Sequence, residues 1–229
     1  MCYQASAIVT WGQSRMAFAS LLGNGIVAKI GSIAAVVLAA GRSTRMGTNK
    51  LIADVGGKPM VRRVAEAALE SAASPVLVVT GHQEADVRIA LTGLDVVFVH
   101  NPNYAQGLSA SLKAGIAAAP ASVAGVLVLL GDMPQIAPAH LDQLIAAFPD
   151  RAGVVIVPVH AGKRGNPVLW PRAFFPAMLA LEGDAGAKRL LAAHADCVRE
   201  VDLGTDAIFL DVDTAEALAH LRRSETPRA

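Results

Sequence analysis

Short apolar runs alternate with stretches of helical periodicity from residue 33 onward. A strand in a parallel sheet is buried on both faces, so its sequence is almost continuously apolar, and helices connect such strands. The expected strands are 33–39, 75–80, 95–100, 125–130, 153–159, 167–170, 198–201 and 207–210, and the expected helices are 59–72, 83–92, 109–119, 138–148, 173–180, 186–194 and 214–223. This alternation predicts an α/β fold of three layers, with helices on both faces of a mostly parallel, Rossmann-like sheet.

The organisation of the chain favours one domain over residues 33–223, because no linker rich in Pro, Ser or charge interrupts that range. Residues 1–32 contain no Asp or Glu and only two cations, Arg15 and Lys29. They lack the charged start and unbroken apolar run of a signal peptide. We expect a weakly structured N-terminal extension there and a short tail at 224–229.

The composition excludes several classes of protein. Twenty Lys and Arg residues oppose nineteen Asp and Glu residues, so the chain has no basic field to collect nucleic acid. Charge or glycine breaks every apolar stretch before about 18 residues, so no membrane span is expected. The two cysteines, Cys2 and Cys197, form no CxxC pair. Neither a disulfide framework nor a structural zinc site is indicated, which favours a reducing, cytoplasmic location.

The loop after the first expected strand is suited to a polyphosphate. It reads AAGRSTRMGTNK over residues 39–50. Small residues and glycine let backbone N–H groups approach phosphates, and three cations, Arg42, Arg45 and Lys50, follow closely. The P-loop pattern GxxxxGK[ST] is missing, so this is a different kind of phosphate loop.

Carboxylates follow two other expected elements. GDMP at 131–134 places Asp132 at the carboxyl end of a strand, where ligands bind in open α/β sheets. Mg²⁺ prefers one or two carboxylates together with phosphate oxygens and water, so a second acid is expected. DVD at 211–213 offers Asp211 and Asp213, and we favour Asp213. An Asp just before a helix is also typical of an N-terminal cap.

Three further loops carry small and hydrogen-bonding residues that suit a nucleobase, a ribose or an acceptor. They are GHQ at 81–83, GLSAS at 107–111 and RGNP at 164–167. Taken singly, the serines are also typical helix caps, and the Gly-Asn pair is typical of a hairpin turn. The segment GDAGAK at 183–188 is compatible with an ordinary helix start.

Taken together, these segments resemble the molybdenum cofactor cytidylyltransferases, which are MobA-like NTP transferases. The matching motifs are LAAG, RMG and NK within 38–50, NPxYAxGLSxSLKAG at 101–115, GDMP at 131–134, GxRGNPV at 162–168, GDxGA at 183–187 and DVDT at 211–214. The resemblance implies a Rossmann-like nucleotidyltransferase fold that uses CTP and Mg²⁺. It also implies transfer of CMP to molybdopterin, which forms the dinucleotide cofactor of xanthine dehydrogenase type hydroxylases.

The resemblance implies roles for individual residues. The catalytic residues would be Arg45, Lys50 and Asp132, and the metal ligands Asp132 and Asp213. The nucleotide-binding residues would be Leu38, Ala39, Ala40, Gly41, Arg45, Lys50, Gly81, Gly107, Ser109, Ser111 and Gly131. The acceptor-binding residues would be Asn166, Pro167, Gly183 and Asp184. Guanylyltransferase relatives have Gly-Gly where this chain has Ala40-Gly41 and usually Asp in place of Asn49, which favours a pyrimidine nucleotide.

Several alternatives stay open at this point. The acceptor could be a sugar phosphate or methylerythritol phosphate, with the chemistry unchanged. DVD is also the metal motif of nucleotide-sugar glycosyltransferases, although there it normally lies mid-chain. The protein could also carry molybdopterin to a hydroxylase without catalysis. A hydroxylase or its chaperone is the expected protein partner.

Overall fold

The computed structural model describes residues 32–42, 49–149, 153–183 and 187–225. Its centre is an eight-stranded sheet with the order β10-β7-β9-β6-β1-β4-β5, in which β8 pairs with β7. The strands are β1 (Ile33–Ala39), β4 (Val76–Thr80), β5 (Val97–His100), β6 (Gly125–Leu130), β7 (Val155–His160), β8 (Lys163–Arg164), β9 (Val168–Pro171) and β10 (Val198–Asp202). The strands run parallel except that β9 is antiparallel to β6 and β7, and β8 to β7. This confirms the mostly parallel α/β sheet.

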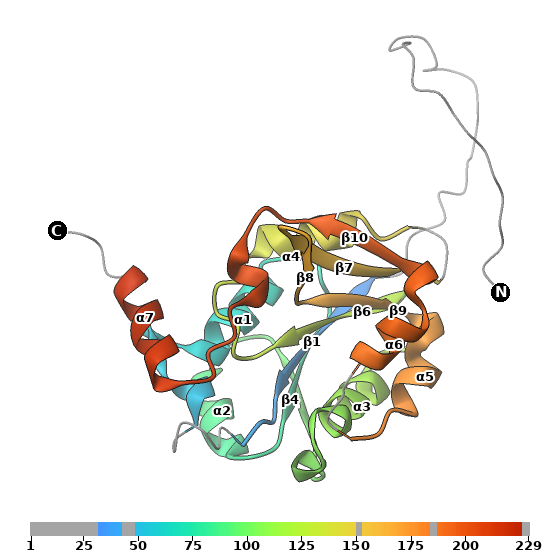
Figure 1. The fold of residues 1–229 in the computed structure, drawn as a ribbon. Coiled ribbons are helices and arrows are strands. Elements are labelled where there is room, and N and C mark those ends of the chain that lie inside the picture. Colours follow the sequence, from blue (N-terminus) through green and yellow to red (C-terminus); the bar gives the residue numbers. More distant parts are fainter. Residues whose placement is uncertain (1–31, 43–48, 150–152, 184–186, 226–229) are drawn as a thin grey trace, which may run out of the picture.

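Helices cover both faces of the sheet (Figure 1). The odd-numbered residues of β1 belong to one core cluster with buried residues of α1, α2 and α4, and its even-numbered residues belong to a second cluster with residues of α3, α5 and α6. The bounds are α1 (Met60–Leu69), α2 (Glu84–Ala90), α3 (Leu108–Ala118), α4 (Pro138–Ala146), α5 (Phe175–Leu179) and α6 (Lys188–Ala193). Every residue of β1 is buried, as a strand between two helical layers requires. The predicted three-layer arrangement is therefore confirmed.

A small third core joins the C-terminal helix to a short hairpin. The hairpin consists of β2 (Asp54–Val55) and β3 (Lys58–Pro59), and the helix is α7 (Ala215–Glu225). Their buried apolar side chains form a cluster of Val55, Met60, Val212, Leu218 and Leu221. The Arg222 guanidinium also donates to the backbone oxygen of Asp54 at 2.8 Å. This core fixes the segment that precedes α7, which carries two of the candidate metal ligands.

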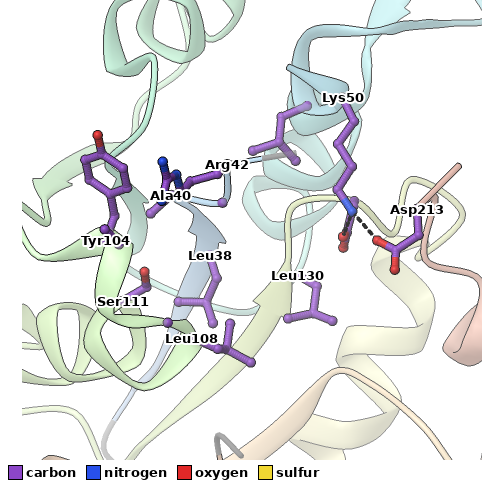
Figure 2. Close-up of a pocket in the computed structure, with 14 residues that line it drawn as sticks. Leu38, Ala40, Arg42, Lys50, Tyr104, Leu108, Ser111, Leu130 and Asp213 are labelled. Atoms are coloured by element: carbon purple, nitrogen blue, oxygen red, sulfur yellow. Dashed lines mark hydrogen bonds and ion pairs between the residues drawn. The ribbon is translucent and has the colours of Figure 1, made fainter. Parts of the chain in front are cut away.

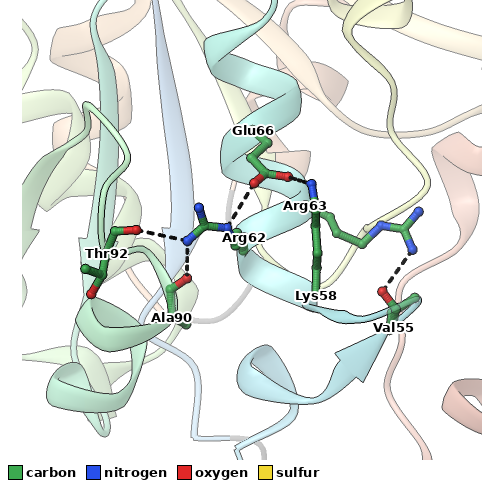
Figure 3. A network of polar contacts seen from close by, with 7 residues as sticks. All are labelled: Val55, Lys58, Arg62, Arg63, Glu66, Ala90 and Thr92. Atoms are coloured by element: carbon green, nitrogen blue, oxygen red, sulfur yellow. Dashed lines mark hydrogen bonds and ion pairs between the residues drawn. The ribbon is translucent and has the colours of Figure 1, made fainter.

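Polar contacts of α1 hold the neighbouring elements in place (Figure 3). Glu66 accepts from Lys58 at 2.6 Å and from the Arg62 guanidinium at 2.9 Å. Arg62 also donates to the backbone oxygens of Ala90 and Thr92 at the end of α2. Arg63 donates to the Val55 oxygen at 3.2 Å. One face of α1 is thereby tied both to the hairpin and to α2.

Some local expectations differ from the structure. The strand expected at 207–210 is a 3-10 helix, Asp206–Phe209, because the Thr205 hydroxyl accepts the Ala207 N–H and closes a tight turn. The helix expected at 59–72 ends at Leu69, and Pro59 is its N-cap rather than its first residue. The helix α7 runs beyond residue 223, to Glu225. The extension predicted for residues 1–32 lies, apart from residue 32, outside the described residues.

None of the helices in the described ranges is long and apolar enough to cross a bilayer. The longest of them, α3 and α7, have 11 residues each. At 1.5 Å per residue such a helix is about 16 Å long, against a hydrocarbon core of about 30 Å.

Candidate active site

The site lies at the edge of the sheet where β1, β4, β5 and β6 end. The register pairs Ala39 with Thr80, Thr80 with His100 and Leu38 with Leu130, so these strands end at nearly the same level. Loops after parallel strands meet at such an edge and form the ligand crevice of open α/β sheets. The loops that the sequence singles out therefore converge in space.

A cavity of about 440 Å³ opens among these loops, and we call it the Lys50 cavity (Figure 2). Its lining residues are Leu38, Ala40, Gly41, Arg42, Lys50, Leu51, Tyr104, Ala105, Gly107, Leu108, Ser111, Leu130, Asp132 and Asp213. Lys50 and Asp213 lie at one end, which we call the charged end, while Tyr104, Leu108 and Ser111 lie at the other, which we call the uncharged end (Figure 2). The Arg42 side chain extends from the loop toward Ala40 and Tyr104 (Figure 2).

Lys50 joins two carboxylates that lie far apart in the sequence. Its Nζ atom lies 2.6 Å from Asp132 Oδ2 and 2.5 Å from Asp213 Oδ1. Asn49 fixes the backbone beside it, because the Asn49 side chain accepts the Leu51 N–H at 3.1 Å and begins a short 3-10 turn, Lys50–Ile52. The three charged side chains therefore form one preorganised cluster at the charged end.

The segment around Asp213 is held by two backbone contacts. The Thr214 hydroxyl accepts the Ala217 N–H at 3.2 Å, so Thr214 serves as the N-cap of α7. The Val212 N–H donates to the backbone oxygen of Asp132 at 3.0 Å, which binds the two acidic segments together. The capping role considered for Asp213 therefore falls to Thr214, and Asp213 lines the cavity.

Burial and charge act against each other in this cluster. Burial disfavours the charged form of Lys50, but Asp132 and Asp213 outweigh it, and the pKa of Lys50 is raised above its ordinary value. Burial also raises the pKa of Asp132, against the opposing influence of Lys50 and with support from Asp211. Lys50 is consequently a cation at neutral pH, and it lies between the carboxylates of Asp132 and Asp213.

The acidic cluster fits a divalent cation. Ligand oxygens of Asp132, Asp211 and Asp213 all lie within 4.8 Å of one another. The buried Oδ1 atom of Asp132 has no hydrogen-bond partner among the described residues. A buried carboxylate oxygen without a donor is costly, and coordination of a hard cation would satisfy it. The structure thus brings both candidates for the second ligand, Asp211 and Asp213, beside Asp132.

Close backbone packing shapes the uncharged end of the cavity. A Cβ atom added at Gly81 would lie 2.6 Å from Tyr104 Cβ and 2.9 Å from Ala40 Cβ. Only glycine therefore lets the Tyr104 side chain pack beside Ala40. Gly107 has φ +99°, a conformation that favours glycine, and it forms the turn that begins α3. Gly81 and Gly107 therefore shape the cavity wall through their backbones, Gly81 by close packing and Gly107 by its positive φ.

A second cavity of about 760 Å³ adjoins the first, and we call it the Trp170 cavity. Leu38, Leu108 and Leu130 line both cavities. Most of its other walls are apolar, and Arg164, Asn166, Lys188 and Asp211 supply polar groups; the apolar lining residues include Leu112, Val128, Met133, Val157, Trp170 and Ile208. Asp211 belongs both to this wall and to the acidic cluster, so the Trp170 cavity adjoins the charged end of the first cavity.

The expected nucleotide-binding residues divide into two groups. Those that line the Lys50 cavity are Leu38, Ala40, Gly41, Lys50, Gly107 and Ser111, together with the expected metal ligands Asp132 and Asp213. Those that lie outside its wall are Ala39, Gly81, Ser109 and Gly131. Ser109 faces a separate groove on the opposite side of α3, and Ala39 is fully buried in β1. Arg45 lies outside the described residues.

The expected acceptor-binding residues are also separated. Asn166 lines the Trp170 cavity, whereas Gly183 lines the groove between α3 and α5 on the far side of α3. Pro167 follows Asn166 but does not line either cavity, and Asp184 lies outside the described residues. Gly165 packs against η5 (Asp206–Phe209), since a Cβ there would lie 2.4 Å from the Ile208 oxygen. This contact brings the β8–β9 loop to the edge of the Trp170 cavity.

Several lining residues were not singled out as ligands from the sequence. Tyr104 lies in the segment NPxYAxG, whose Asn-Pro and Gly residues already indicate a turn after a strand. Arg164 and Lys188 are ordinary surface cations in the sequence, and only the fold brings them to one cavity. Trp170 ends a short apolar run, which is the signal of a core residue.

The fold and this site define a class of protein. A three-layer α/β sheet whose carboxyl edge presents a phosphate-loop cation, clustered carboxylates and two adjoining cavities is the arrangement expected of a nucleotidyltransferase of the Rossmann-like type. Residues 35–198 match the MobA-like NTP transferase domain. The chain belongs to this family, as its sequence motifs indicate.

Relatives support this membership over most of the chain. The purine catabolism protein PucB of Bacillus subtilis is 30% identical over 203 residues, which are 82% of this chain and 95% of PucB. The crystal structure of Rv0371c from Mycobacterium tuberculosis is 30% identical, with a TM-score of 0.73 over 84% of this chain and 98% of that one. Rv0371c has also been solved in complex with manganese, at a TM-score of 0.71.

A nucleotidyl transferase from Methanothermobacter shares 25% identity at a TM-score of 0.75, over 85% of this chain and 97% of that one. A manganese complex of a relative and the cluster of three carboxylates together indicate a divalent cation at this site.

Proposed function

We propose that this protein transfers CMP from CTP to molybdopterin, with release of pyrophosphate and formation of molybdopterin cytosine dinucleotide. The observation that carries the proposal is the meeting of two different cavities at one acidic cluster. The Lys50 cavity has the charged end and the small uncharged end that a nucleoside triphosphate needs. The Trp170 cavity is larger and mostly apolar, and it reaches the same cluster through Asp211.

The nucleotide assignment is supported by the chemistry of the Lys50 cavity. The backbone of Ala40 and Gly41 borders the cavity beside the Arg42 and Lys50 side chains, as a triphosphate requires. The uncharged end between Leu108 and Tyr104 suits a small base. Ala40-Gly41 in place of Gly-Gly supports a pyrimidine, so CTP is the proposed donor. Arg45 is proposed as a further phosphate ligand.

The acceptor assignment is supported by the walls of the Trp170 cavity. The pyrimidine ring of a reduced pterin is planar, and it can pack against apolar walls of the kind that Trp170 and Leu112 provide. Arg164 and Lys188 supply positive charge for a phosphate group, and Asn166 supplies hydrogen bonds. We also propose Pro167 and Asp184 as residues of the acceptor side, which follows the family resemblance. Gly183 is not proposed, because it lines the groove on the far side of α3.

The reaction is a phosphoryl-group displacement. A terminal phosphate oxygen of the acceptor attacks the α-phosphorus of CTP, and the bond from that phosphorus to the bridging oxygen breaks, so pyrophosphate leaves. The acceptor phosphate is already ionised at neutral pH, and no general base is required. Lys50 and Arg42 hold the triphosphate and stabilise the negative charge that develops on the transferred group and on pyrophosphate.

The carboxylates are the proposed ligands of Mg²⁺. Asp132 and Asp213 would hold the ion, with Asp211 beside them. When bound, the ion supplies Lewis-acid stabilisation of phosphate oxygens. The Lys50 ammonium group contacts both Asp132 and Asp213, and it thereby keeps the two carboxylates oriented toward the cavity.

The cellular role follows from the product. PucB carries the name of a purine catabolism protein, and xanthine is itself a purine. A dinucleotide cofactor for a xanthine dehydrogenase type hydroxylase fits such a role. We therefore propose delivery of the product to such a hydroxylase or to its chaperone as the next step.

Substitution of Asp132 tests the proposed catalytic centre. Asp132→Asn keeps the size of the side chain but removes its charge, and we expect dinucleotide formation to fall by about 100-fold or more. Asp95→Asn is the matched control, because Asp95 is exposed and lines neither cavity. Thermal melting of both variants, compared with the wild type, serves as the control for folding. Near-normal turnover by Asp132→Asn would overturn the assignment.

A further inference from the structure

We propose that Asn101 is a positioning residue, which directs the Ser111 hydroxyl so that it donates a hydrogen bond to the base of the nucleotide. The inference rests on the proposed use of the Lys50 cavity by a nucleoside triphosphate. It adds a basis for discrimination between nucleobases, which is the hydrogen bond between two buried polar side chains. Asn101 is 3% exposed and Ser111 is 5% exposed.

The hydrogen bonds of Asn101 fix the orientation of its amide. The residue directly follows β5, and its backbone N–H donates to the Thr80 oxygen at 2.8 Å. Its Oδ1 atom accepts the Asn103 N–H at 3.0 Å, so this end of the amide must be the oxygen. The Nδ2 group therefore faces Ser111 and donates to Ser111 Oγ at 3.1 Å.

The direction of the Ser111 hydroxyl follows from this bond. Because Oγ accepts from Asn101, the hydroxyl proton must point away from the amide. A serine inside a helix commonly donates to the carbonyl four residues earlier, which here belongs to Gly107. Among the described residues, Ser111 has no such bond and no other acceptor for its proton. The side chain lines the Lys50 cavity, so the donor is available to a ligand.

The position of Ser111 within the cavity selects the base. Ser111 lies beside Tyr104 and Leu108, at the end opposite Lys50 and Asp213 (Figure 2). With phosphates at the charged end, the base reaches Ser111. Cytosine presents an acceptor at N3, whereas uracil presents an N–H there, although both bases keep the O2 acceptor. A fixed donor directed at N3 therefore favours CTP over UTP.

The Asn101→Asp substitution reverses the direction of the hydrogen bond between residue 101 and Ser111. In the Asn101→Asp variant one carboxylate oxygen still accepts the Asn103 N–H, so the turn after β5 is retained. The other oxygen takes the place of the Nδ2 donor and is an acceptor. The Ser111 hydroxyl then donates to this carboxylate instead of to the ligand, and the cavity loses its donor.

The test measures binding of CTP and UTP, with Mg²⁺ present, by titration calorimetry on the full chain. We expect Asn101→Asp and Ser111→Ala each to weaken CTP binding by about three- to tenfold, with a smaller effect on UTP. In the proposed reaction, KM for CTP rises by a similar factor while kcat changes little. Lys113→Gln is the matched control, because Lys113 lies on α3 but faces the opposite groove.

A double variant separates positioning from a structural role. If Asn101 acts through Ser111, then Asn101→Asp has no further effect on the CTP-to-UTP preference once Ser111 is alanine. Additive effects, or an unchanged preference in both single variants, overturn the inference. Should Asn101→Asp fail to fold, Ser111→Ala can still overturn the inference, because an unchanged CTP-to-UTP preference in that variant would show that Ser111, through which Asn101 acts, does not choose the base.

Failure of this inference is distinct from failure of the proposed function. A wild-type chain that prefers CTP and responds to both substitutions, but forms no dinucleotide, refutes the proposed acceptor alone. A wild-type chain that forms the dinucleotide and ignores both substitutions refutes the positioning role alone. A wild-type chain that binds UTP as tightly as CTP overturns the positioning role directly.

Discussion

Replacement of Lys50 by methionine should destabilise the metal-free protein by about 2–4 kcal/mol. The ammonium group lies 2.6 Å from Asp132 and 2.5 Å from Asp213, and the Lys50 side chain is 13% exposed. Methionine retains the apolar stem but removes the ammonium group that contacts both Asp132 and Asp213. Loss of one partner of a buried pair costs about 3–5 kcal/mol, and the 36% exposure of the Asp213 side chain lowers that figure.

The stability that Lys50→Met loses relative to the wild type should depend on pH and on divalent cations. Burial raises the pKa of Asp132, and Lys50 opposes that rise. Without Lys50 the pKa rises further above its unfolded value. A carboxyl group whose pKa is raised in the folded state makes the protein less stable as the pH rises through the range between its unfolded and folded pKa. The stability difference between Lys50→Met and the wild type is therefore smaller at acid pH than at neutral pH. Mn²⁺ or Mg²⁺ should also stabilise the variant more than the wild type.

Urea unfolding in the presence of a chelator measures this effect, repeated at acid and neutral pH and with millimolar Mn²⁺. Thermal melting provides a second reading, with a decrease of about 4–16 °C expected for a chain of this size. Lys58→Met is the matched control. Lys58 also pairs with a carboxylate at 2.6 Å, but its side chain is 54% exposed, so we expect a change within about 1 kcal/mol. A Lys50→Met protein as stable as the wild type at neutral pH would refute the reasoning.

Three further substitutions test the supporting structure. Gly81→Ala forces a Cβ atom to within 2.6 Å of Tyr104, and we expect a loss of about 1–3 kcal/mol in urea unfolding together with weaker nucleotide binding; full stability would contradict the packing. Thr214→Ala removes the N-cap of α7 and should cost about 1 kcal/mol, measured by thermal melting against Thr92→Ala. The pKa of Glu66 is lowered, chiefly by its hydrogen bond from Lys58, so its contribution is present at neutral pH and is lost as the pH falls through the folded pKa. Glu66→Gln should therefore be less stable by up to about 1 kcal/mol at neutral pH and equal to the wild type in strong acid, and a deficit that persists in acid would disprove the charge effect.

The central strands could be predicted from the sequence because they are buried on both faces. The run at 33–39 matches β1 without error, since no polar residue interrupts it and both helical layers cover it. The strand predicted from the apolar run at 207–210 is wrong for a physical reason. A Thr hydroxyl just before it accepts a backbone N–H, and this local bond favours a 3-10 turn over a strand. The hairpin at Asp54–Pro59 is too short to produce a periodic signal.

The site was predictable only in part, because its geometry depends on contacts between distant residues. Asp132 and Lys50 were recognisable from their loops, but their separation by 82 residues conceals the bond between them. The role of Gly81 also depends on packing, since its closeness to Tyr104 has no signal in the sequence. The separation of Ser109 from Ser111 follows from helical geometry, because residues two apart point to different faces of α3.

The most direct test of the central claim is a product assay with each of CTP, GTP, ATP and UTP. The full chain is incubated with Mg²⁺ and one nucleotide, with and without molybdopterin in its molybdenum form, and pyrophosphate and the dinucleotide are measured. We predict release of pyrophosphate with CTP alone, only when the pterin is present, and in equal amount to the dinucleotide. Release with another nucleotide, or with a sugar phosphate or methylerythritol phosphate in place of the pterin, would contradict the proposed function.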